Sequence, residues 1–177
     1  MTRLVNSLLN VARISDGKFS YTFVPTNISA ILSRVSDDFA DKIKAKKIVF
    51  TSDVPEDLPQ VPVDEGTFSL VVENLLDNAI KYTPESGSVS LSAGPRQGGI
   101  RIIVSDSGIG IAEEDQRRIF EKFFRSKQAT QMFTDGSGLG LFIVKTIVED
   151  HGGTISLSSR QGGGTQVTVD LSATPKA

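Results

Sequence analysis

The 177-residue sequence predicts an α+β fold, a two-layer α/β sandwich with a mixed, mostly antiparallel sheet and helices on one face. Two observations favour this class. Long segments carry apolar residues at the spacing of amphipathic helices, and shorter segments between them have the composition of strands. The last two strands are joined across three glycines, 162–164, which is typical of an antiparallel hairpin. Elements in this order favour helices packed against one face of a sheet.

The N-terminal residues predict a helix that belongs to a separate unit. Leu4, Leu8 and Val11 are four and three residues apart, as in the seam of a helical bundle. The helix is expected to end at Gly17, which suits a left-handed C-terminal cap. Because a helix this short is marginal on its own, we interpret residues 1–17 as the end of a longer helix and residues 18–177 as one domain.

Strands and helices then alternate along the first half of the domain. A strand is expected from Phe19 to Val24, followed by a helix over about 28–45 with Asn27 as its N-cap. A second strand is expected over 48–51, and the prolines and acids of 53–62 predict a loop.

The second half is predicted to hold two long helices and two hairpins. The first helix begins after Asp64 and runs to Tyr82, and Pro84 ends it because proline disfavours a helical residue before it. The remaining expected elements are strands at 88–93 and 100–105, a short helix at 113–120, a helix from 139 to 151 that glycines end, and strands at 154–158 and 166–171.

A polar ridge follows one face of the helix over 64–82. Asn74, Asn78 and Lys81 are four and then three residues apart, so they share that face. Amide oxygens can complete the shell of a magnesium ion that holds nucleotide phosphates, and a lysine one turn further can meet the phosphates. A solvated helix face is the alternative. Two glycine-rich stretches downstream favour the nucleotide site.

The first glycine-rich stretch begins at the end of a predicted strand. Asp106 is followed by Gly108 and Gly110. A carboxylate there can accept a hydrogen bond from an adenine amino group, and glycines let a ligand approach the backbone closely. A tight turn between strand and helix is the alternative interpretation.

The second stretch, Gly136, Gly138 and Gly140, opens a helix, and helix N-termini favour phosphate groups. A flexible linker into a core helix is the alternative. The spacing matches neither the Rossmann fingerprint nor the P-loop, and the His-Arg-Asp of protein kinases does not occur. Before it, residues 123–135 are polar and aperiodic, which predicts a mobile lid, and Arg125 is placed to reach a terminal phosphate.

Composition limits the partners. The net charge of −2 gives no case for nucleic acid or an acidic membrane surface. The absence of cysteine excludes disulfides and thiolate metal sites and fits a reducing compartment, so a cytoplasmic location is expected. No apolar run approaches the length of a membrane span, so no membrane contact is expected of these residues.

Five motifs in this order resemble the ATP-binding catalytic domain of sensor histidine kinases. That domain shares the Bergerat-type ATP-binding fold with gyrase and MutL-type ATPases. The matches are Glu73-Asn-Leu-Leu-Asp-Asn-Ala-Ile-Lys-Tyr-Thr-Pro84, Asp106-Ser-Gly-Ile-Gly-Ile111, Phe120-Glu-Lys-Phe-Phe-Arg125, Gly136-Ser-Gly-Leu-Gly-Leu141 and Gly162-Gly-Gly-Thr165. They span most of residues 18–172. Each motif is weak alone, and five in the family's order and spacing are highly specific.

The resemblance implies ATP and Mg²⁺ as cofactors and a role for each matched residue. Asn74 and Asn78 are expected to bind magnesium. Lys81 and Arg125 are expected to meet the phosphates, and Tyr82 to lie against the base. Asn74, Lys81 and Arg125 form the expected catalytic set. The expected nucleotide contacts are Asn74, Asn78, Lys81, Tyr82, Asp106, Gly108, Gly110, Ile111, Phe120, Arg125, Gly136, Ser137, Gly138, Leu139, Gly140, Leu141 and Thr165.

The resemblance also implies partners. Residues 1–17 resemble the end of the second helix of the family's dimerisation and histidine-phosphotransfer domain, whose first helix carries the phospho-accepting histidine. The chain has one histidine, His151, which is expected to cap a helix. The expected partners are therefore ATP, a histidine-bearing dimerisation domain and a response regulator receiver domain. Self-phosphorylation is not expected without that acceptor.

Two other functions remain open on the same fold: an anti-sigma-type serine kinase, and a nucleotide-binding regulatory module without transfer activity. The resemblance favours transfer over ATP hydrolysis. Gyrase-like ATPases place a catalytic glutamate four residues before the magnesium asparagine, and here Asn74 stands at that position. An amide cannot take a proton, and Glu73 is turned about 100° around the helix.

Overall fold

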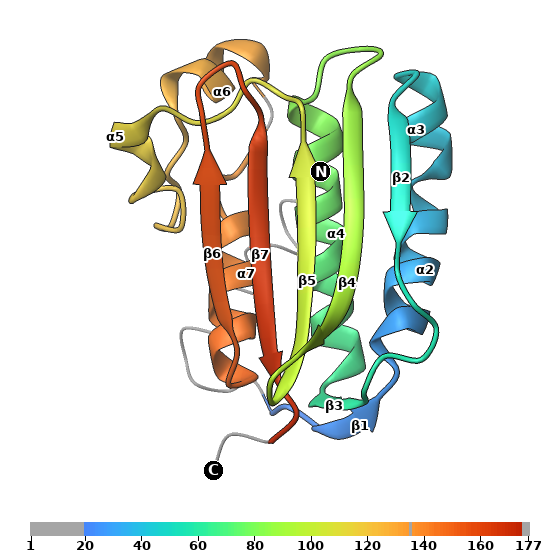
Figure 1. The fold of residues 1–177 in the computed structure, drawn as a ribbon. Coiled ribbons are helices and arrows are strands. Elements are labelled where there is room, and N and C mark those ends of the chain that lie inside the picture. The colour runs from blue at the N-terminus through green and yellow to red at the C-terminus, as the bar shows by residue number, and fades with distance from the viewer. Residues whose placement is uncertain (1–19, 135, 175–177) are drawn as a thin grey trace.

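The structure is a computed structural model that describes residues 20–134 and 136–174. Its main sheet has the strand order β2-β4-β5-β7-β6, in which only the pair β2-β4 is parallel. Helices α2, α4 and α7 pack against one face of this sheet (Figure 1). The strands are β2 (Val49–Asp53), β4 (Ser88–Arg96), β5 (Gly99–Asp106), β6 (Thr154–Ser159) and β7 (Thr165–Ser172). The predicted fold class is confirmed.

The helices are α2 (Ile28–Asp38), α3 (Ala40–Ala45), α4 (Glu65–Tyr82), α5 (Glu113–Gln116), α6 (Lys127–Met132) and α7 (Gly140–Asp150). The short strands β1 (Val24–Thr26) and β3 (Val61–Val63) form a separate antiparallel ribbon. No helix in the described part of the chain is long and apolar enough to cross a membrane. The helix and domain boundary predicted for residues 1–17 lie outside the described residues.

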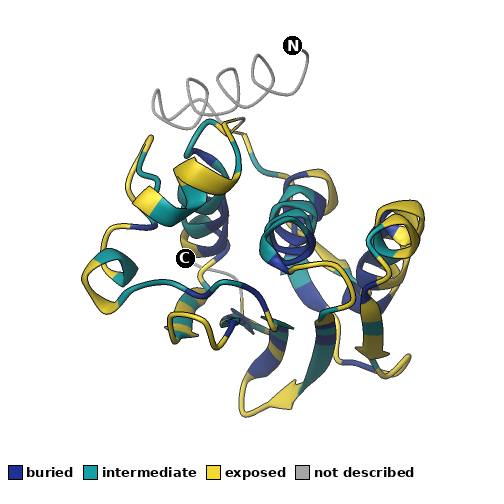
Figure 2. Cartoon of the chain, turned by 90° about the horizontal axis from the view of Figure 1, so that it is seen from above, coloured by how far each residue is buried: buried dark blue, intermediate teal, exposed yellow. Residues whose placement is uncertain are grey.

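The core lies between the helices and the sheet, and buried positions face it from both layers (Figure 2). Every second residue of β5 points inward, and Ile100, Ile102 and Val104 are all buried. Leu76 of α4 and Ile147 of α7 are fully buried on the facing helices. Helices α4 and α7 both pack on this sheet and also contact each other.

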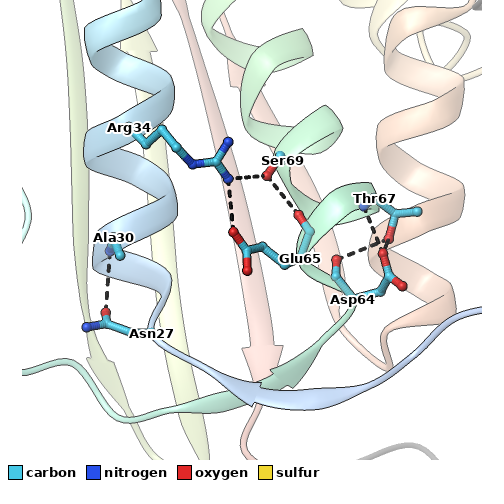
Figure 3. Close-up of polar contacts among 7 residues, drawn as sticks. All are labelled: Asn27, Ala30, Arg34, Asp64, Glu65, Thr67 and Ser69. Atoms are coloured by element: carbon cyan, nitrogen blue, oxygen red, sulfur yellow. Dashed lines mark hydrogen bonds and ion pairs between the residues drawn. The ribbon is translucent and has the colours of Figure 1, made fainter.

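The N-termini of α2 and α4 are capped as predicted (Figure 3). The side chain of Asn27 accepts from the amide of Ala30, and Asp64 Oδ1 accepts from the amide of Thr67 at 2.9 Å. Arg34 then joins the two helices by donating to Glu65 Oε1 and to the Ser69 hydroxyl. The caps satisfy amides that have no partner within the helix.

Three predicted boundaries near the N-terminus are wrong. Among the described residues, the strand expected from Phe19 to Val24 starts only at Val24, as β1, and the loop expected over 53–62 contains the end of β2 and the start of β3. Each strand holds a proline, and Pro25 and Pro62 are opposite each other. Proline is tolerated there because a two-stranded ribbon has edges that need no N–H donor. The helix expected over 28–45 is broken at Phe39, whose φ of −96° and ψ of −2° depart from helical geometry.

Two shorter helices also differ from expectation. The helix expected over 113–120 ends at Gln116 and continues as turns. The aperiodic segment 123–135 contains α6, whose N-cap is Ser126. The Ser126 hydroxyl accepts from the amide of Ala129 at 3.1 Å. A short surface helix such as α6 has no buried apolar stripe, so its spacing of apolar residues does not predict it. It depends on its N-cap instead.

His151 caps α7 as predicted and is buried, with 3% of its surface exposed. Its Nε2 accepts from the amide of Asp64 at 3.1 Å, so Nδ1 carries the proton and donates to Ile147 O. The rings of Tyr21 and Phe23 meet the imidazole edge-on. Burial lowers the pKa of His151 below its ordinary value.

The free energy of unfolding is therefore expected to decrease as the pH is lowered below about 6.5. In that range the unfolded chain takes up a proton at His151, whereas the folded chain does not, because protonated Nε2 loses its role as an acceptor. Each pH unit down to the folded-state pKa costs at most about 1.4 kcal/mol. Urea unfolding of the parent and of His151→Gln at pH 7.5 and 5.5 measures this. Equal pH dependence in the two proteins would show that His151 is not responsible.

Candidate functional site

A cavity of about 960 Å³ lies at one end of α4 and α7, next to the end of β5. The described residues that line it extend in sequence from Phe39 to Val167. The lining includes most of the predicted site: Asn74, Asn78, Lys81, Tyr82, Asp106, Gly110, Ile111, Arg125, Gly136, Ser137, Gly138, Gly140, Leu141 and Thr165. Residues that are far apart in sequence are thus gathered around one space.

Three predicted residues do not line this cavity. Leu139 is fully buried in the core and is the N-cap residue of α7. Phe120 lies half-buried, with the Lys145 ammonium 5.8 Å from its ring. Gly108 is packed against the end of α4, since a Cβ there would lie 2.6 Å from Tyr82 O. These residues support the walls of the cavity.

Asp106 ends β5 and is fixed by two backbone amides. Its Oδ1 accepts from the amides of Gly108 at 2.8 Å and Thr165 at 3.2 Å. Burial raises the pKa of this carboxyl above its ordinary value, and the two hydrogen bonds only partly oppose this effect. A half-buried carboxylate that borders a cavity and is bound through one oxygen can accept a further hydrogen bond at Oδ2.

The glycine turn before β7, residues 162–164, lies in close contact with the backbone of Asp106. Gly164 has φ +83°, and a Cβ at this position would lie 2.0 Å from Asp106 O. The next residue, Thr165, shares its hydroxyl with Ser159 at 2.9 Å, and Ser159 also accepts from the amide of Ile111. This contact requires glycine and aligns the floor of the cavity.

The two asparagines of α4 face the first residue of α7. Asn74 donates through Nδ2 to Leu70 O at 2.7 Å, which leaves its Oδ1 directed away from its own helix. A Cβ on Gly140 would lie 2.8 Å from that Oδ1 and 3.9 Å from Asn78 Nδ2. Glycine at position 140 therefore lets the start of α7 approach the amide ridge closely.

The amide ridge suits a magnesium ion that is held mainly by a ligand's oxygens. Within residues 20–134 and 136–174, no three His, Cys, Asp or Glu side chains gather in a way that could hold a metal. The amide oxygens of Asn74 and Asn78, together with ligand oxygens and water, could hold a metal at this cavity. Magnesium accepts such a set, because it commonly keeps several waters and few protein ligands.

Lys81 and Tyr82, in the last turn of α4, meet the ring of Phe133 from the predicted lid. The Lys81 ammonium lies 4.9 Å from the centre of that ring. The Tyr82 and Phe133 rings are edge-to-face, with centres 5.7 Å apart. Burial raises the pKa of the Tyr82 hydroxyl, and the nearby Arg125 partly opposes it. Phe133 could not be predicted as a site residue, since a lone aromatic in a polar segment has no periodicity.

Arg125 binds the backbone of the lid in this structure. Its guanidinium donates to four carbonyl oxygens, those of Ala129, Phe133, Thr134 and Gly136. These oxygens belong to α6 and to the chain that follows it. One side chain therefore holds this segment in a folded loop, and an approach to a terminal phosphate would require Arg125 to exchange some of these partners.

Arg125→Ala is expected to release residues 127–134 without affecting the sheet. Four carbonyls lose their donor, and each hydrogen bond to a charged group is worth about 1.5–3 kcal/mol when it is desolvated and less at this half-exposed position. Hydrogen exchange of the amides of α6 should become at least about tenfold faster. The matched control is Arg117→Ala, an exposed arginine. Unchanged exchange in α6 would show that Arg125 does not hold it.

Sequence reasoning missed part of the lining. Glu73, Ile109, Phe124, Ser126, Ala129 and Thr134 border the cavity as well. Glu73 and Ile109 lie inside the predicted motifs, in which only neighbouring residues were expected to contact the nucleotide. Ala129 and Thr134 reach the cavity only because α6 folds back over it, which requires the Arg125 contacts.

The family model described as "Histidine kinase-, DNA gyrase B-, and HSP90-like ATPase" matches residues 63–175. The chain is 35% identical to the sensor-like histidine kinase SenX3 of Mycolicibacterium smegmatis over 97% of its length, which is 44% of that protein. It thus spans less than half of this curated relative. A structure of full-length ShkA in complex with AMPPNP has a TM-score of 0.83 at 31% identity, over 99% of this chain and 36% of that one. The histidine kinase ThkA in complex with the response regulator TrrA gives 0.78 at 28% identity, over 98% and 49%.

Proposed function

The chain belongs to the family of histidine kinase-, DNA gyrase B- and HSP90-like ATPases, and from this premise we propose that it is the catalytic domain of a sensor histidine kinase. It carries the family's ATP-binding ATPase domain. In the proposed reaction it transfers the γ-phosphoryl group of ATP to a histidine on a dimerisation domain. One observation carries the proposal: an acceptor for adenine, Asp106, and a ridge of amide and ammonium groups on α4 border the same cavity.

Adenine recognition is assigned to Asp106 and Tyr82. With Oδ1 held by two amides, Oδ2 of Asp106 is available to the adenine amino group, which donates to it. The Tyr82 ring lies against the base once Phe133 moves aside. Asp106 Oδ2 can accept a hydrogen bond from the amino group of adenine. As a carboxylate it cannot donate one to the carbonyl oxygen that guanine carries instead.

The phosphates are assigned to the second glycine stretch and the start of α7. Gly138 has φ +67° and packs under Phe123, so the chain turns there with its amides near the cavity. Lys81 supplies a positive charge from α4, and Asn74 and Asn78 would hold the magnesium ion that accompanies ATP. Bound there, magnesium would neutralise charge that develops on the phosphate oxygens. In this proposal ATP can bind while the Arg125 guanidinium keeps its hydrogen bonds to the lid backbone.

The transfer step asks the protein for positioning and for charge stabilisation. A ring nitrogen of the acceptor histidine forms a bond to the γ-phosphorus, and the bond from that phosphorus to the bridging oxygen breaks, which releases ADP. Position 74 is an asparagine, which cannot abstract a proton from water. This difference supports transfer over hydrolysis and predicts slow ATP turnover by the chain alone.

The acceptor is placed on a partner because His151 is not accessible. Both of its ring nitrogens are engaged with backbone groups of Asp64 and Ile147, and the residue is buried at the opposite end of α7 from Gly140. A receiver domain of a response regulator is proposed as the partner that takes the phosphoryl group next. A cytoplasmic location is proposed with it, since receiver domains and ATP meet there.

Incubation with γ-labelled ATP is expected to leave this chain unlabelled and to label a separately supplied dimerisation domain of the full-length kinase. The new phosphoramidate should be labile to acid and stable to alkali. Labelling should be weak, because the tether that raises the effective concentration is missing. The control is His151→Gln, which should label the partner equally well.

Three outcomes would contradict the proposal. An acid-labile label on His151 would mean that the imidazole reaches ATP despite its burial. An acid-stable label on a serine of a partner would identify a serine kinase of the anti-sigma type instead. ATP binding without any transfer to the dimerisation domain would identify a regulatory module.

A further inference from the structure

The last turn of α4 ends beside the cavity, and all its terminal carbonyls have donors. A helix leaves its final carbonyl oxygens without partners in the helix itself, so others must supply them. Ala79 O accepts from the amide and the hydroxyl of Thr83, and Tyr82 O accepts from the amide of Ile109. The carbonyls of Ile80, Lys81 and Thr83 remain to be satisfied by groups from elsewhere in the chain.

One ammonium group satisfies these three. Lys46 Nζ donates to Ile80 O at 2.8 Å, to Lys81 O at 3.0 Å and to Thr83 O at 2.6 Å. An ammonium has three N–H donors, and all three are used. Its positive charge also faces the negative end of the helix dipole. No described residue other than Lys46 donates to these three oxygens from outside α4.

The backbone of Lys46 is fixed as well. It ends α3, where its amide donates to Lys42 O, and its own carbonyl accepts from the amide of Ser86 in the loop that follows α4. The side chain of Lys46 therefore binds the end of α4, and its main chain binds the loop that follows that helix. Burial lowers the pKa of the Lys46 ammonium, which agrees with its half-buried position.

The clamped turn carries two residues of the proposed nucleotide site, Lys81 and Tyr82. The Lys81 carbonyl is itself one of the oxygens that Lys46 holds, and the Tyr82 carbonyl binds Ile109 in the loop after Asp106. The directions in which these side chains leave the helix are set by the same turn. We propose that Lys46 is a positioning residue for ATP, acting through Lys81 and Tyr82 without touching the nucleotide. This inference rests on the proposed function.

The neighbouring lysine provides a contrast. Lys47 pairs with Glu85 at 2.7 Å, but the two side chains are 71% and 61% exposed. Exposed pairs of this kind contribute little. Lys47→Met is therefore a matched control with the same chemical change one residue away.

The test is a double-mutant cycle between Lys46→Met and Lys81→Met, read as the dissociation constant of Mg-ATP by calorimetry well below each melting temperature. Lys46→Met is expected to weaken binding about tenfold, because a displaced supporting turn costs affinity on that scale. The double variant should lose less affinity than the sum of the two single losses, since part of the effect of Lys46 passes through Lys81. Lys47→Met should bind like the parent.

Hydrogen exchange at residues 79–83 without nucleotide separates this inference from the proposed function. Faster exchange in Lys46→Met, but not in Lys47→Met, is expected even if the parent binds no ATP, in which case the proposed function fails and the clamp stands. Additive losses in the cycle would overturn the positioning role, as would parent-like affinity in Lys46→Met. If Lys46→Met does not fold, Lys46→Arg serves in the cycle, because it keeps the charge but its planar group cannot match three converging carbonyls.

Discussion

Asp106→Asn is expected to weaken ATP binding by about 10- to 100-fold, the value of a hydrogen bond to a charged group. The side-chain amide can be placed in two ways, and both fail. With its oxygen toward the amides of Gly108 and Thr165, its NH₂ faces the amino group of adenine. With its oxygen toward adenine, its NH₂ faces those two amides. In either orientation the NH₂ group faces another donor, so the hydrogen bond to adenine or the pair of hydrogen bonds from Gly108 and Thr165 is lost.

Calorimetry with ATP and GTP measures the effect, with Asp53→Asn, at an exposed position of β2, as the control. The variant should discriminate less between the two nucleotides. Because burial raises the pKa of Asp106, ATP affinity of the parent should fall as pH drops through that raised pKa, and the variant should lack this dependence. The free protein should not be destabilised by the loss of charge, since the fold already favours a neutral carboxyl. Parent-like ATP affinity in the variant would remove Asp106 from the site.

Gly164→Ala is expected to destabilise the fold by about 3 kcal/mol or more. The new Cβ would lie 2.0 Å from Asp106 O, which is backbone and cannot turn away. The backbone φ of +83° adds strain for any residue with a side chain. Relief requires Thr165 to move away from Asp106, so residual folded protein should also bind ATP more weakly.

Gly162→Ala is the matched control in the same turn. Its φ of +72° is similar, but no described heavy atom lies within 4 Å of the new Cβ. It should cost only about 1 kcal/mol, the strain of the left-handed conformation alone. Chemical denaturation of both variants isolates the steric contact. Equal losses in the two would show that the approach of Gly164 to Asp106 is not tight.

Much of this fold could be predicted because local signals and packing agree. Helix α4 has an N-cap at Asp64, an apolar stripe and a proline after its end, and all three act within the helix itself. The closing hairpin was equally clear from its glycines. The fold class depends on such elements and needs few details of their contacts.

The errors occur where distant parts of the chain decide the outcome. The strand at Val61–Val63 exists because β1 pairs with it, and the prolines and acids around its two valines predicted a loop. The break at Phe39 places that side chain in the core. In the site, Asp106 was found by its motif, but Lys46 was not, because its three acceptors lie 34 to 37 residues further along the chain.

The strand order has a consequence for how the chain is made. β7 is the last strand in the sequence, yet it lies inside the sheet between β5 and β6. During synthesis, β5 and β6 must wait with unpaired edges until residues 165–172 emerge from the ribosome. Asp106 pairs with Thr165 across this last junction, so the adenine pocket cannot exist on a shorter nascent chain. Contacts this distant in sequence also slow folding. ATP can therefore stabilise only chains that have been synthesised through β7.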